Sequence, residues 1–359
     1  MKKYVLPLLI TAITCLMSCS SKDDETMFVG PSNRYLIEIN GKYGYINNSG
    51  DVVISPQFEF ARHFREGLAM IGDGSDGPIG FIDTNGKIVI KLEYDDAESF
   101  SEGYAQVKIG NSWGYISRKG KVVIEPIYEK TFPFSEGVAA VKEKNGKWGF
   151  INQKGDYIVQ PQFSDVGSFS EGFAPADGGY ISKDGKYRIT PQYISSSIFK
   201  EGRALVSNRE LKYGQSAIID TLGNIINVIN KIPIQMMYSE GRIAVEGNNG
   251  KGQGYADRNG NTIILPNYDN ACDFHEGLAR ISINGRWGYI DTLGRTIIEP
   301  KLFYAFDFRE GLALVAYNET SYAYINREGR IVYEFSNYNP FFTAIYGLTF
   351  NNPRYDNNL

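Results

Sequence analysis

The sequence predicts an all-β repeat protein, and three observations support this class. A motif of the form Asn-Gly-(Lys/Arg)-Trp-Gly-aromatic-Ile recurs, most clearly at residues 145–151 and 284–290. The chain contains 25 Tyr, 21 Phe and 39 Gly, which suits short strands joined by tight turns. A turn glycine also recurs about every 35 residues, a spacing typical of solenoids, propellers and other arrays, at Gly50, Gly86, Gly120, Gly155, Gly185, Gly223, Gly260, Gly294 and Gly329.

Residues 1–18 have the features of a secretory signal. Two lysines precede a short apolar run at residues 4–17, which is too short to span a bilayer. The run Leu16-Met17-Ser18-Cys19 resembles a lipoprotein lipobox, although a smaller residue is more usual at position 17. The resemblance implies that residues 1–18 are a lipoprotein signal peptide. Cys19 would then carry the lipid, with palmitate among its acyl chains.

Residues 19–33 are expected to be a linker between the lipid and the repeats. Within it, Lys22-Asp23-Asp24 resembles the tether that carries some lipoproteins to the cell surface, and a plain hydrophilic linker is the alternative. We therefore expect an outer-membrane lipoprotein at the cell surface, attached to the membrane by its N-terminal lipid. The periplasmic face is the alternative location. With Cys19 acylated, Cys272 has no partner for an intramolecular disulfide.

Each repeat is predicted to be a three-stranded antiparallel meander, as residues 277–306 illustrate. Asn284-Gly285 favours a type I′ hairpin turn between the first two strands. The turn that ends at Gly294 joins the second strand to the third. Pro300 is expected to end the third strand because it has no N–H for the ladder. The residues that follow are predicted to be a linker to the next repeat.

Nine such repeats, spanning residues 34–335, are expected to form an open, twisted or superhelical β-array. A closed β-propeller is the alternative, although propeller blades usually have four strands and usually number four to eight. Residues 336–359 are predicted to be a C-terminal cap and tail. Repeats five and six depart most from the pattern, around residues 174–179 and 211–216. A bend or a lost ligand position is expected there.

A Glu-Gly pair precedes the first strand of eight repeats. Catalytic carboxylates converge in one pocket, whereas these recur once per repeat. We therefore predict a structural role, in which each carboxylate accepts hydrogen bonds from backbone N–H groups at the turn. The pairs begin at Glu66, Glu102, Glu136, Glu171, Glu201, Glu240, Glu276 and Glu310.

Aromatic residues at the first position of the Trp-Gly motif are candidate ligand-stacking residues. They suit the faces of sugar rings, and packing between repeats is the alternative role. The next position holds glycine, replaced only by Ala217 and Ala323, which predicts a close approach of another backbone. The aromatic candidates are Tyr43, Trp113, Trp148, Trp287 and Tyr322.

The sequence favours neither an enzyme nor a nucleic-acid-binding protein. Its two histidines, His63 and His275, lie where other repeats carry serine or arginine, so we interpret them as surface substitutions. No catalytic constellation, metal-ligand cluster or cofactor-binding loop is evident. Lys and Arg total 37 against 41 Asp and Glu, mixed along the chain, so no basic stripe for phosphates is predicted.

The chain resembles the bacterial WG-repeat family, with the best copies at residues 276–304 and 136–163. The resemblance implies an exported all-β repeat protein and supplies no catalytic residues. We therefore expect a non-catalytic cell-envelope lipoprotein whose repeats form a binding scaffold for a protein or a glycan, without cofactor or metal. A structural spacer of the envelope is the alternative, and a carbohydrate-active enzyme is a more remote one.

Overall fold

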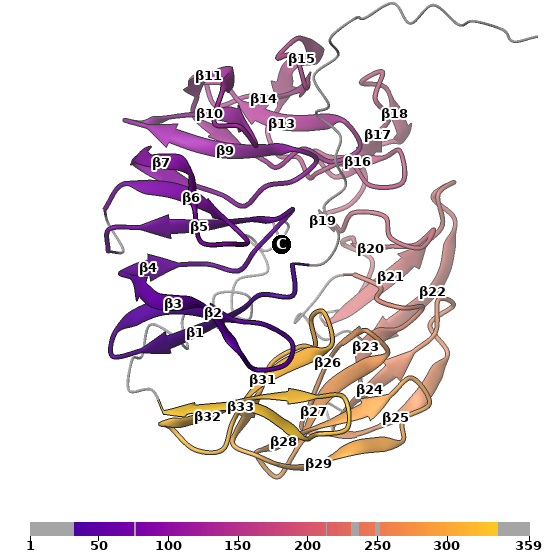
Figure 1. Ribbon diagram of the computed structural model, residues 1–359. Helices are drawn as coiled ribbons and strands as arrows, with labels where there is room; N and C mark the ends of the chain where they lie inside the picture. The colour runs from indigo at the N-terminus through magenta and orange to yellow at the C-terminus, as the bar shows by residue number, and fades with distance from the viewer. Residues whose placement is uncertain (1–31, 75–76, 213, 231–236, 248–251, 337–359) are drawn as a thin grey trace, which may run out of the picture.

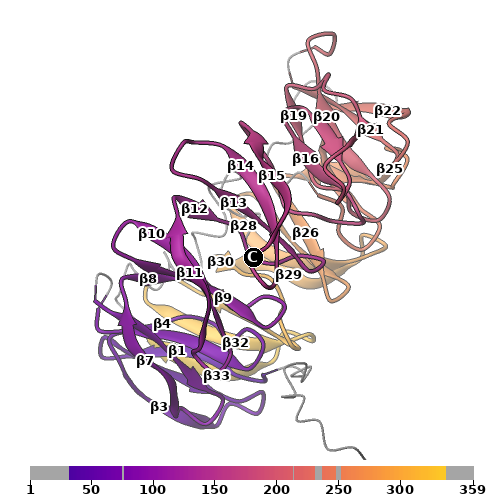
Figure 2. The same cartoon turned by 90° about the horizontal axis from the view of Figure 1, so that it is seen from above.

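The computed structural model describes residues 32–74, 77–212, 214–230, 237–247 and 252–336. Within these residues nine antiparallel sheets follow one another around a common axis. Figure 1 shows that the indigo and yellow ends of the chain lie side by side, so the array closes into a ring, a β-propeller. The predicted open array is therefore wrong, and the propeller alternative is correct. Figure 2 shows the first and last sheets at the end of the molecule opposite β19–β22.

The nine sheets, called blades 1–9 in chain order, consist of the following strands. Blade 1 contains β1 (Tyr35–Ile39), β2 (Lys42–Ile46) and β3 (Val52–Phe58); blade 2 contains β4 (Phe60–Ala61), β5 (Leu68–Gly72), β6 (Ile79–Asp83) and β7 (Ile88–Tyr94); blade 3 contains β8 (Asp96–Ala97), β9 (Tyr104–Ile109), β10 (Ser112–Ser117) and β11 (Val122–Tyr128). Blade 4 contains β12 (Lys130–Thr131), β13 (Val138–Lys142), β14 (Trp148–Asn152) and β15 (Tyr157–Phe163); blade 5 contains β16 (Ala174–Ala176), β17 (Gly179–Ile181) and β18 (Tyr187–Ile189); blade 6 contains β19 (Ser195–Ser196), β20 (Ala204–Ser207), β21 (Gln215–Ile219) and β22 (Ile225–Asn230). Blade 7 contains β23 (Ile243–Glu246), β24 (Gln253–Ala256) and β25 (Thr262–Tyr268); blade 8 contains β26 (Asn270–His275), β27 (Leu278–Ile283), β28 (Arg286–Asp291) and β29 (Thr296–Leu302); blade 9 contains β30 (Tyr304–Ala305), β31 (Leu312–Ala316), β32 (Ser321–Asn326) and β33 (Ile331–Ser336).

The predicted meander is present in every blade, and six blades add a fourth strand from the segment expected to be a linker. This strand pairs with the first strand of the meander; for example, Ala271 of β26 lies opposite Ile281 of β27. In five of the six blades this strand is two residues long, and only β26 extends to six; such short pairings leave little periodicity in the sequence. No helix long and apolar enough to cross a membrane occurs in the described ranges.

The motif glycine is required by a bulge in the third strand of its blade. The register of β28 against β29 shifts between Trp287 and Tyr289, on either side of Gly288. A Cβ on Gly288 would lie only 2.4 Å from the carbonyl oxygen of Ile298 and 2.7 Å from the nitrogen of Pro300. The predicted close backbone approach is thus confirmed. Pro300, however, lies inside β29 rather than ending it, so that prediction was wrong. At a bulged outer strand, the missing N–H of proline is tolerated.

The two alanine exceptions occur where the third strand is regular. Opposite Ala217 and Ala323, the ladders of β21 with β22 and of β32 with β33 continue without a register shift. Neither β22 nor β33 contains a proline. Because the third strand does not bulge toward the second there, a methyl group is accommodated. The identity of this residue therefore follows the course of the neighbouring strand.

Neighbouring blades are joined by the turn glycines and by a tyrosine of the motif. A Cβ on Gly294 of blade 8 would lie 3.2 Å from Cγ2 of Ile264 in blade 7, and equivalent glycines pack similarly against the preceding blade. The hydroxyl of Tyr289 donates to the carbonyl oxygen of Phe306 in blade 9 at 2.6 Å. These contacts bury apolar and aromatic groups between successive sheets, which supplies most of the driving force for closure.

The same contacts close the ring between blades 9 and 1. The hydroxyl of Tyr324 donates to the carbonyl oxygen of Leu36 at 2.7 Å, and the turn at Gly50 lies against Val332. A single buried cluster contains residues of both blades, including Tyr35 and Leu314. Blade 1 therefore follows blade 9 in the same way that any other blade follows its predecessor.

The Glu-Gly pairs form a second set of links between blades. Both residues have positive φ, as Glu276 (53°) and Gly277 (78°) illustrate, so they make a tight turn before the first strand of the meander. The carboxylate of Glu276 accepts the N–H of Gly311 in the next blade at 3.0 Å. At the closure, Glu310 accepts the N–H groups of Ser32 (2.8 Å) and Asn33 (2.6 Å).

The structural role predicted for these glutamates is confirmed, with the difference that the turn they bind belongs to the following blade. Glu201 differs from the others because its carboxylate accepts a bond from Nε of Arg258 at 3.2 Å. Among the described residues, the glutamates that accept backbone N–H groups of the next blade are Glu66, Glu102, Glu136, Glu171, Glu240, Glu276 and Glu310.

Candidate functional site

The five aromatic residues predicted to stack on a ligand lie at equivalent positions of five different blades and do not come together in one site. Tyr43, Trp148 and Tyr322 are buried, at 3%, 8% and 7% exposure. Trp113 and Trp287 are only partly covered. Packing within and between blades accounts for the buried three, so accessible ring surface for a ligand is concentrated on the other two. Their stacking role remains a prediction.

The partly covered tryptophans each lie beside a cation. The guanidinium carbon of Arg280 is 5.5 Å from the ring centroid of Trp287, and Nζ of Lys108 is 6.0 Å from that of Trp113. Trp287 also packs against Tyr304 of blade 9, with 5.3 Å between ring centroids. These contacts fix the orientation of the rings. The predicted lipid attachment site, Cys19, and the signal peptide and tether around it lie outside the described residues.

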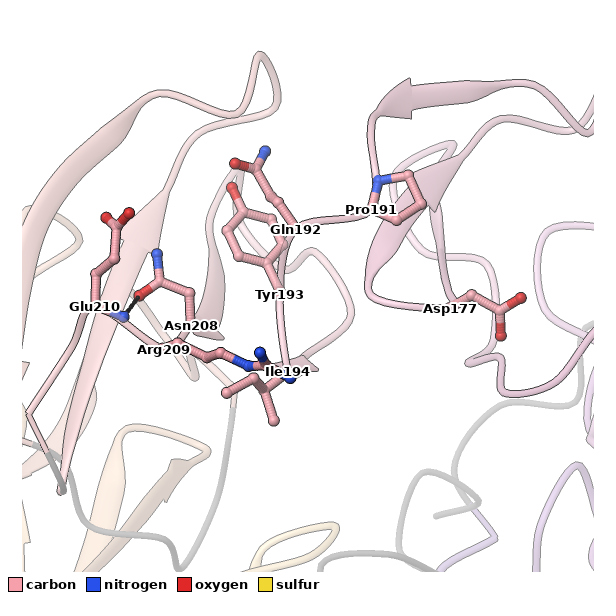
Figure 3. A pocket seen from close by; sticks show the side chains of 8 residues that line it. All are labelled: Asp177, Pro191, Gln192, Tyr193, Ile194, Asn208, Arg209 and Glu210. Carbon is pink, nitrogen blue, oxygen red and sulfur yellow. Dashed lines mark hydrogen bonds between the residues drawn. The ribbon is translucent and has the colours of Figure 1, made fainter.

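An open cavity of about 650 Å³ lies between blades 5 and 6 and is a candidate ligand site (Figure 3). One wall comes from residues 191–194, which connect β18 to β19. The facing wall comes from residues 208–210, in the loop between β20 and β21, and Asp177 lies at its edge. Figure 3 shows Gln192 and Arg209 projecting from these two segments.

The cavity exists because blade 5 is the shortest of the sheets described. β16, β17 and β18 have three residues each, whereas β9 and β10 of blade 3 have six. The backbone after β18 bends sharply, since the N–H groups of Gln192 and Tyr193 both donate to the carbonyl oxygen of Gly178. The longer loop of blade 6 then projects past this shortened edge. Blade 5 therefore has no strand residues at this edge to fill the space between the two walls.

Two polar side chains in this cavity are free to bind a ligand. Gln192 and Arg209 are exposed, and neither side chain makes a hydrogen bond or ion pair with the part of the chain that the structure describes. Asp177 and Asn208 are instead occupied: Asp177 accepts the N–H of Asp165 at 2.9 Å, and Asn208 accepts that of Glu210 at 3.1 Å. The hydrogen bonds of Asp177 and Asn208 hold the walls of the cavity in shape. The amide of Gln192 and the guanidinium of Arg209 offer donors that match carbonyl, hydroxyl or carboxylate oxygens.

The sequence did not identify Gln192 or Arg209, and it predicted a bend or a lost ligand position rather than a binding site in repeats five and six. Repeats five and six were singled out because they depart most from the motif, and the cavity lies between these two blades. The free side chains themselves lie outside the motif. Their exposure depends on how far the loop of one blade extends beyond the edge of its neighbour, which no local pattern encodes.

Ionisable residues of the inner strands form a second cluster, between blades 8 and 9. Arg280, which is 1% exposed, donates from Nε to Asp307 at 2.7 Å and from Nη1 to the carbonyl oxygen of Ala305 at 3.0 Å. Nε2 of His275 lies 3.6 Å from the same aspartate. Burial, and then the charge of Asp307, raises the pKa of Asp273 to about 7. Arg280 and Asp307 form a buried ion pair that is also hydrogen-bonded, and this pair links blades 8 and 9.

The two histidines differ in their surroundings. The side chain of His275 is 44% exposed, as expected of a surface substitution. His63 is partly covered, and burial together with the charges of Arg309 and Arg65 lowers its pKa to about 3. The surface interpretation of His63 thus holds only in part, because the side chain is partly covered and the surrounding arginines disfavour its charged form. In the described ranges, no group of three or more His, Cys, Asp or Glu side chains is placed to hold a metal ion.

Comparison with known families gives seven matches to the family described as WG containing repeat. The matched segments are residues 43–72, 79–113, 113–148, 148–176, 179–211, 254–287 and 287–320. Together they span more than half of the chain. No curated protein matches the sequence significantly.

Two solved structures resemble the chain at low sequence identity. A crystal structure described as the eukaryotic initiation factor matches 85% of this chain and 96% of its own, at 12% identity and a TM-score of 0.60. The computationally designed Ika8 protein matches 77% of this chain and 95% of its own, at 10% identity and a TM-score of 0.46. At such identity the first likeness concerns the fold alone.

Proposed function

The chain belongs to the WG containing repeat family, and from this premise we propose that it is a non-catalytic binding scaffold that holds a glycan or a protein on the surface of its propeller. The observation that carries the proposal is the open cavity between blades 5 and 6, with the free side chains of Gln192 and Arg209. Propeller surfaces of this kind present several loops to one ligand. The repeated carboxylates, in contrast, are used in joining blades.

Binding at this cavity can be tested with the full chain in detergent, using an array of polysaccharides and a crosslinking pull-down. Replacing Arg209 with alanine removes a donor that can bind an oxygen acceptor in bidentate fashion. We expect affinity for the captured ligand to fall by about tenfold, which corresponds to about 1.4 kcal/mol. Arg286, also exposed but on blade 8, provides the matched control, and its alanine variant should bind normally.

Several outcomes would count against the scaffold. If no glycan and no crosslinked protein is bound, the spacer alternative is favoured. Equal weakening by the Arg209→Ala and Arg286→Ala variants would show that net charge, rather than this cavity, governs binding. Unchanged far-UV circular dichroism in both variants is needed to exclude unfolding as the cause.

We further propose that the scaffold is a lipoprotein of the outer membrane, exposed at the cell surface. The lipobox-like run ending at Cys19 and the tether Lys22-Asp23-Asp24 support this placement. The Cys19→Ala variant should lose labelling by a palmitate analogue and leave the membrane fraction, because one peptide segment without acyl chains has little affinity for a bilayer. Retention of label and membrane association would contradict the assignment, and digestion of intact cells by an impermeant protease distinguishes the two faces.

A further inference from the structure

Lysines gather at the turns between the second and third strands of blades 3 and 4. Lys119 and Lys121 flank Gly120 in blade 3, and Lys154 precedes Gly155 in blade 4. A Cβ on Gly155 would lie 3.4 Å from Cγ1 of Ile124, so the blade 4 turn rests against β11, which begins directly after Lys121. The two turns are therefore neighbours in space. The equivalent turns of blades 6 and 8, at residues 220–224 and 291–295, contain no lysine, whereas those of blades 2 and 5 contain Lys87 and Lys183 with Lys186.

A cavity of about 540 Å³ separates these turns. Lys121 and Lys154 line it from the two blades, together with Val122 and Val123 of β11 and with Gln153. The valines are half-buried, so they offer an apolar surface beside the two ammonium groups. A groove that combines cations, an amide and a small apolar wall suits a sugar ring that bears an anionic group.

The lysines are available for such a ligand. Lys119, Lys121 and Lys154 are exposed and form no ion pair or hydrogen bond through their side chains with the described part of the chain. Elsewhere on the propeller, lysines of similar exposure do form pairs; Nζ of Lys183, for example, lies 3.5 Å from the carboxylate of Glu136. Two lysines that line one groove, and a third on the turn beside it, thus form no ion pair with the described part of the chain.

Nearby carboxylates are already hydrogen-bonded. Glu102 accepts the N–H groups of Glu136 and Gly137 at 2.6 and 2.8 Å, and Gly137 is itself part of the groove. Asp156 accepts a bond from Nδ2 of Asn152 at 3.2 Å. Both carboxylates lie near the groove, so they moderate its electrostatic field. Lys121 and Lys154 line the groove and Lys119 lies on the same turn as Lys121, so three lysines stand near these two carboxylates.

We propose that this groove binds acidic polysaccharide, with Lys121 and Lys154 contacting carboxylates of the sugar chain. The inference rests on the proposed binding function and names a ligand class and a second site for it. A polysaccharide suits the arrangement because Lys119, Lys121 and Lys154 succeed one another across two blades, as repeated anionic groups do along a polymer. A bilayer is less suited, since the ammonium groups border a recessed groove rather than a flat or protruding surface.

The test uses polygalacturonate as probe, with neutral dextran and vesicles containing phosphatidylglycerol as separate arms. The full chain in detergent, or reconstituted for the vesicle arm, is expected to bind polygalacturonate in a salt-sensitive manner and to ignore dextran. The double variant Lys121→Ala, Lys154→Ala should bind about tenfold more weakly. The matched control Lys91→Ala, Lys301→Ala removes two exposed lysines from the third strands of blades 2 and 8, and should bind normally.

An equal loss of affinity for polygalacturonate in both double variants would overturn the assignment of this groove. No loss of affinity in the Lys121→Ala, Lys154→Ala variant would overturn it as well. Binding to anionic vesicles without binding to polygalacturonate would overturn the ligand class in favour of a membrane surface. If polygalacturonate is not bound while another ligand is captured in a manner that depends on Arg209, the present inference fails and the proposed function stands. Failure of both kinds of binding contradicts the proposed function as well.

Discussion

Replacing Gly50 with alanine is expected to lower the free energy of unfolding by about 3 to 4 kcal/mol, because two costs combine at this position. Gly50 has a φ of +88°, which a residue with a side chain adopts only with strain. A Cβ there would also lie 2.5 Å from the carbonyl oxygen of Val332, in the last blade. The overlap acts directly on the closure between blades 9 and 1. Urea unfolding monitored by tryptophan fluorescence measures the loss.

Gly41 supplies the matched control for this substitution. Its φ is +78°, but no atom lies within 4 Å of the position that its Cβ would take. The Gly41→Ala variant should therefore lose only the conformational part, about 1 kcal/mol. The difference in free energy of unfolding between the Gly50→Ala and Gly41→Ala variants therefore measures the effect of the contact that closes the ring. If both variants lose the same amount, blade 1 does not depend on blade 9 in the way that the geometry indicates.

Replacing Gly288 with alanine is expected to cost about 3 kcal/mol or more, since the overlapping atoms belong to backbone and cannot rotate away. The carbonyl oxygen of Ile298 and the nitrogen of Pro300 lie 2.4 and 2.7 Å from the position of the new Cβ. Relief would require the bulge in β29 to flatten, which would displace the ladder with β28. The thermal unfolding midpoint and the urea midpoint should both fall.

The reciprocal substitution provides the control. Ala323 occupies the same position in blade 9, where the ladder of β32 with β33 is regular from Ser321 to Tyr324. The Ala323→Gly variant should lose about 0.5 to 1 kcal/mol, the usual effect of glycine in a strand or helix interior. A loss at Ala323 as large as that at Gly288 would mean that the bulge does not explain the distribution of glycine and alanine.

The sequence allowed a good part of one repeat to be predicted. Asn284-Gly285 marked a hairpin, Gly294 marked the next turn, and the run of glycines in the motif marked a close backbone approach that the structure contains. These features are local, because a turn with positive φ or a crowded backbone restricts the residue type at that position. The hydrogen bonds of Glu276 and its equivalents were likewise anticipated, although not their direction toward the following blade.

Other features could not be obtained from such patterns. The inner strand is often two residues long, as in β4 and β30, too short for periodicity to appear. The rule that predicts Pro300 to end a strand applies to central ladders, whereas β29 is a bulged outer strand. The cavity with Gln192 and Arg209 results from the different lengths of two adjacent blades. Each of these depends on a neighbour rather than on the residue itself.

What the sequence by itself determined is the repeat: its period, its turns, its three principal strands and the residue types that each turn demands. What only the tertiary structure decided is closure, since Glu310 meets Ser32 across 278 positions of sequence. Each blade packs on the next at an angle set by whole interfaces, and small angles summed over nine blades determine whether the ends meet or pass one another. No single repeat contains that sum, so the ring and the grooves between unequal blades exist only in the assembled fold.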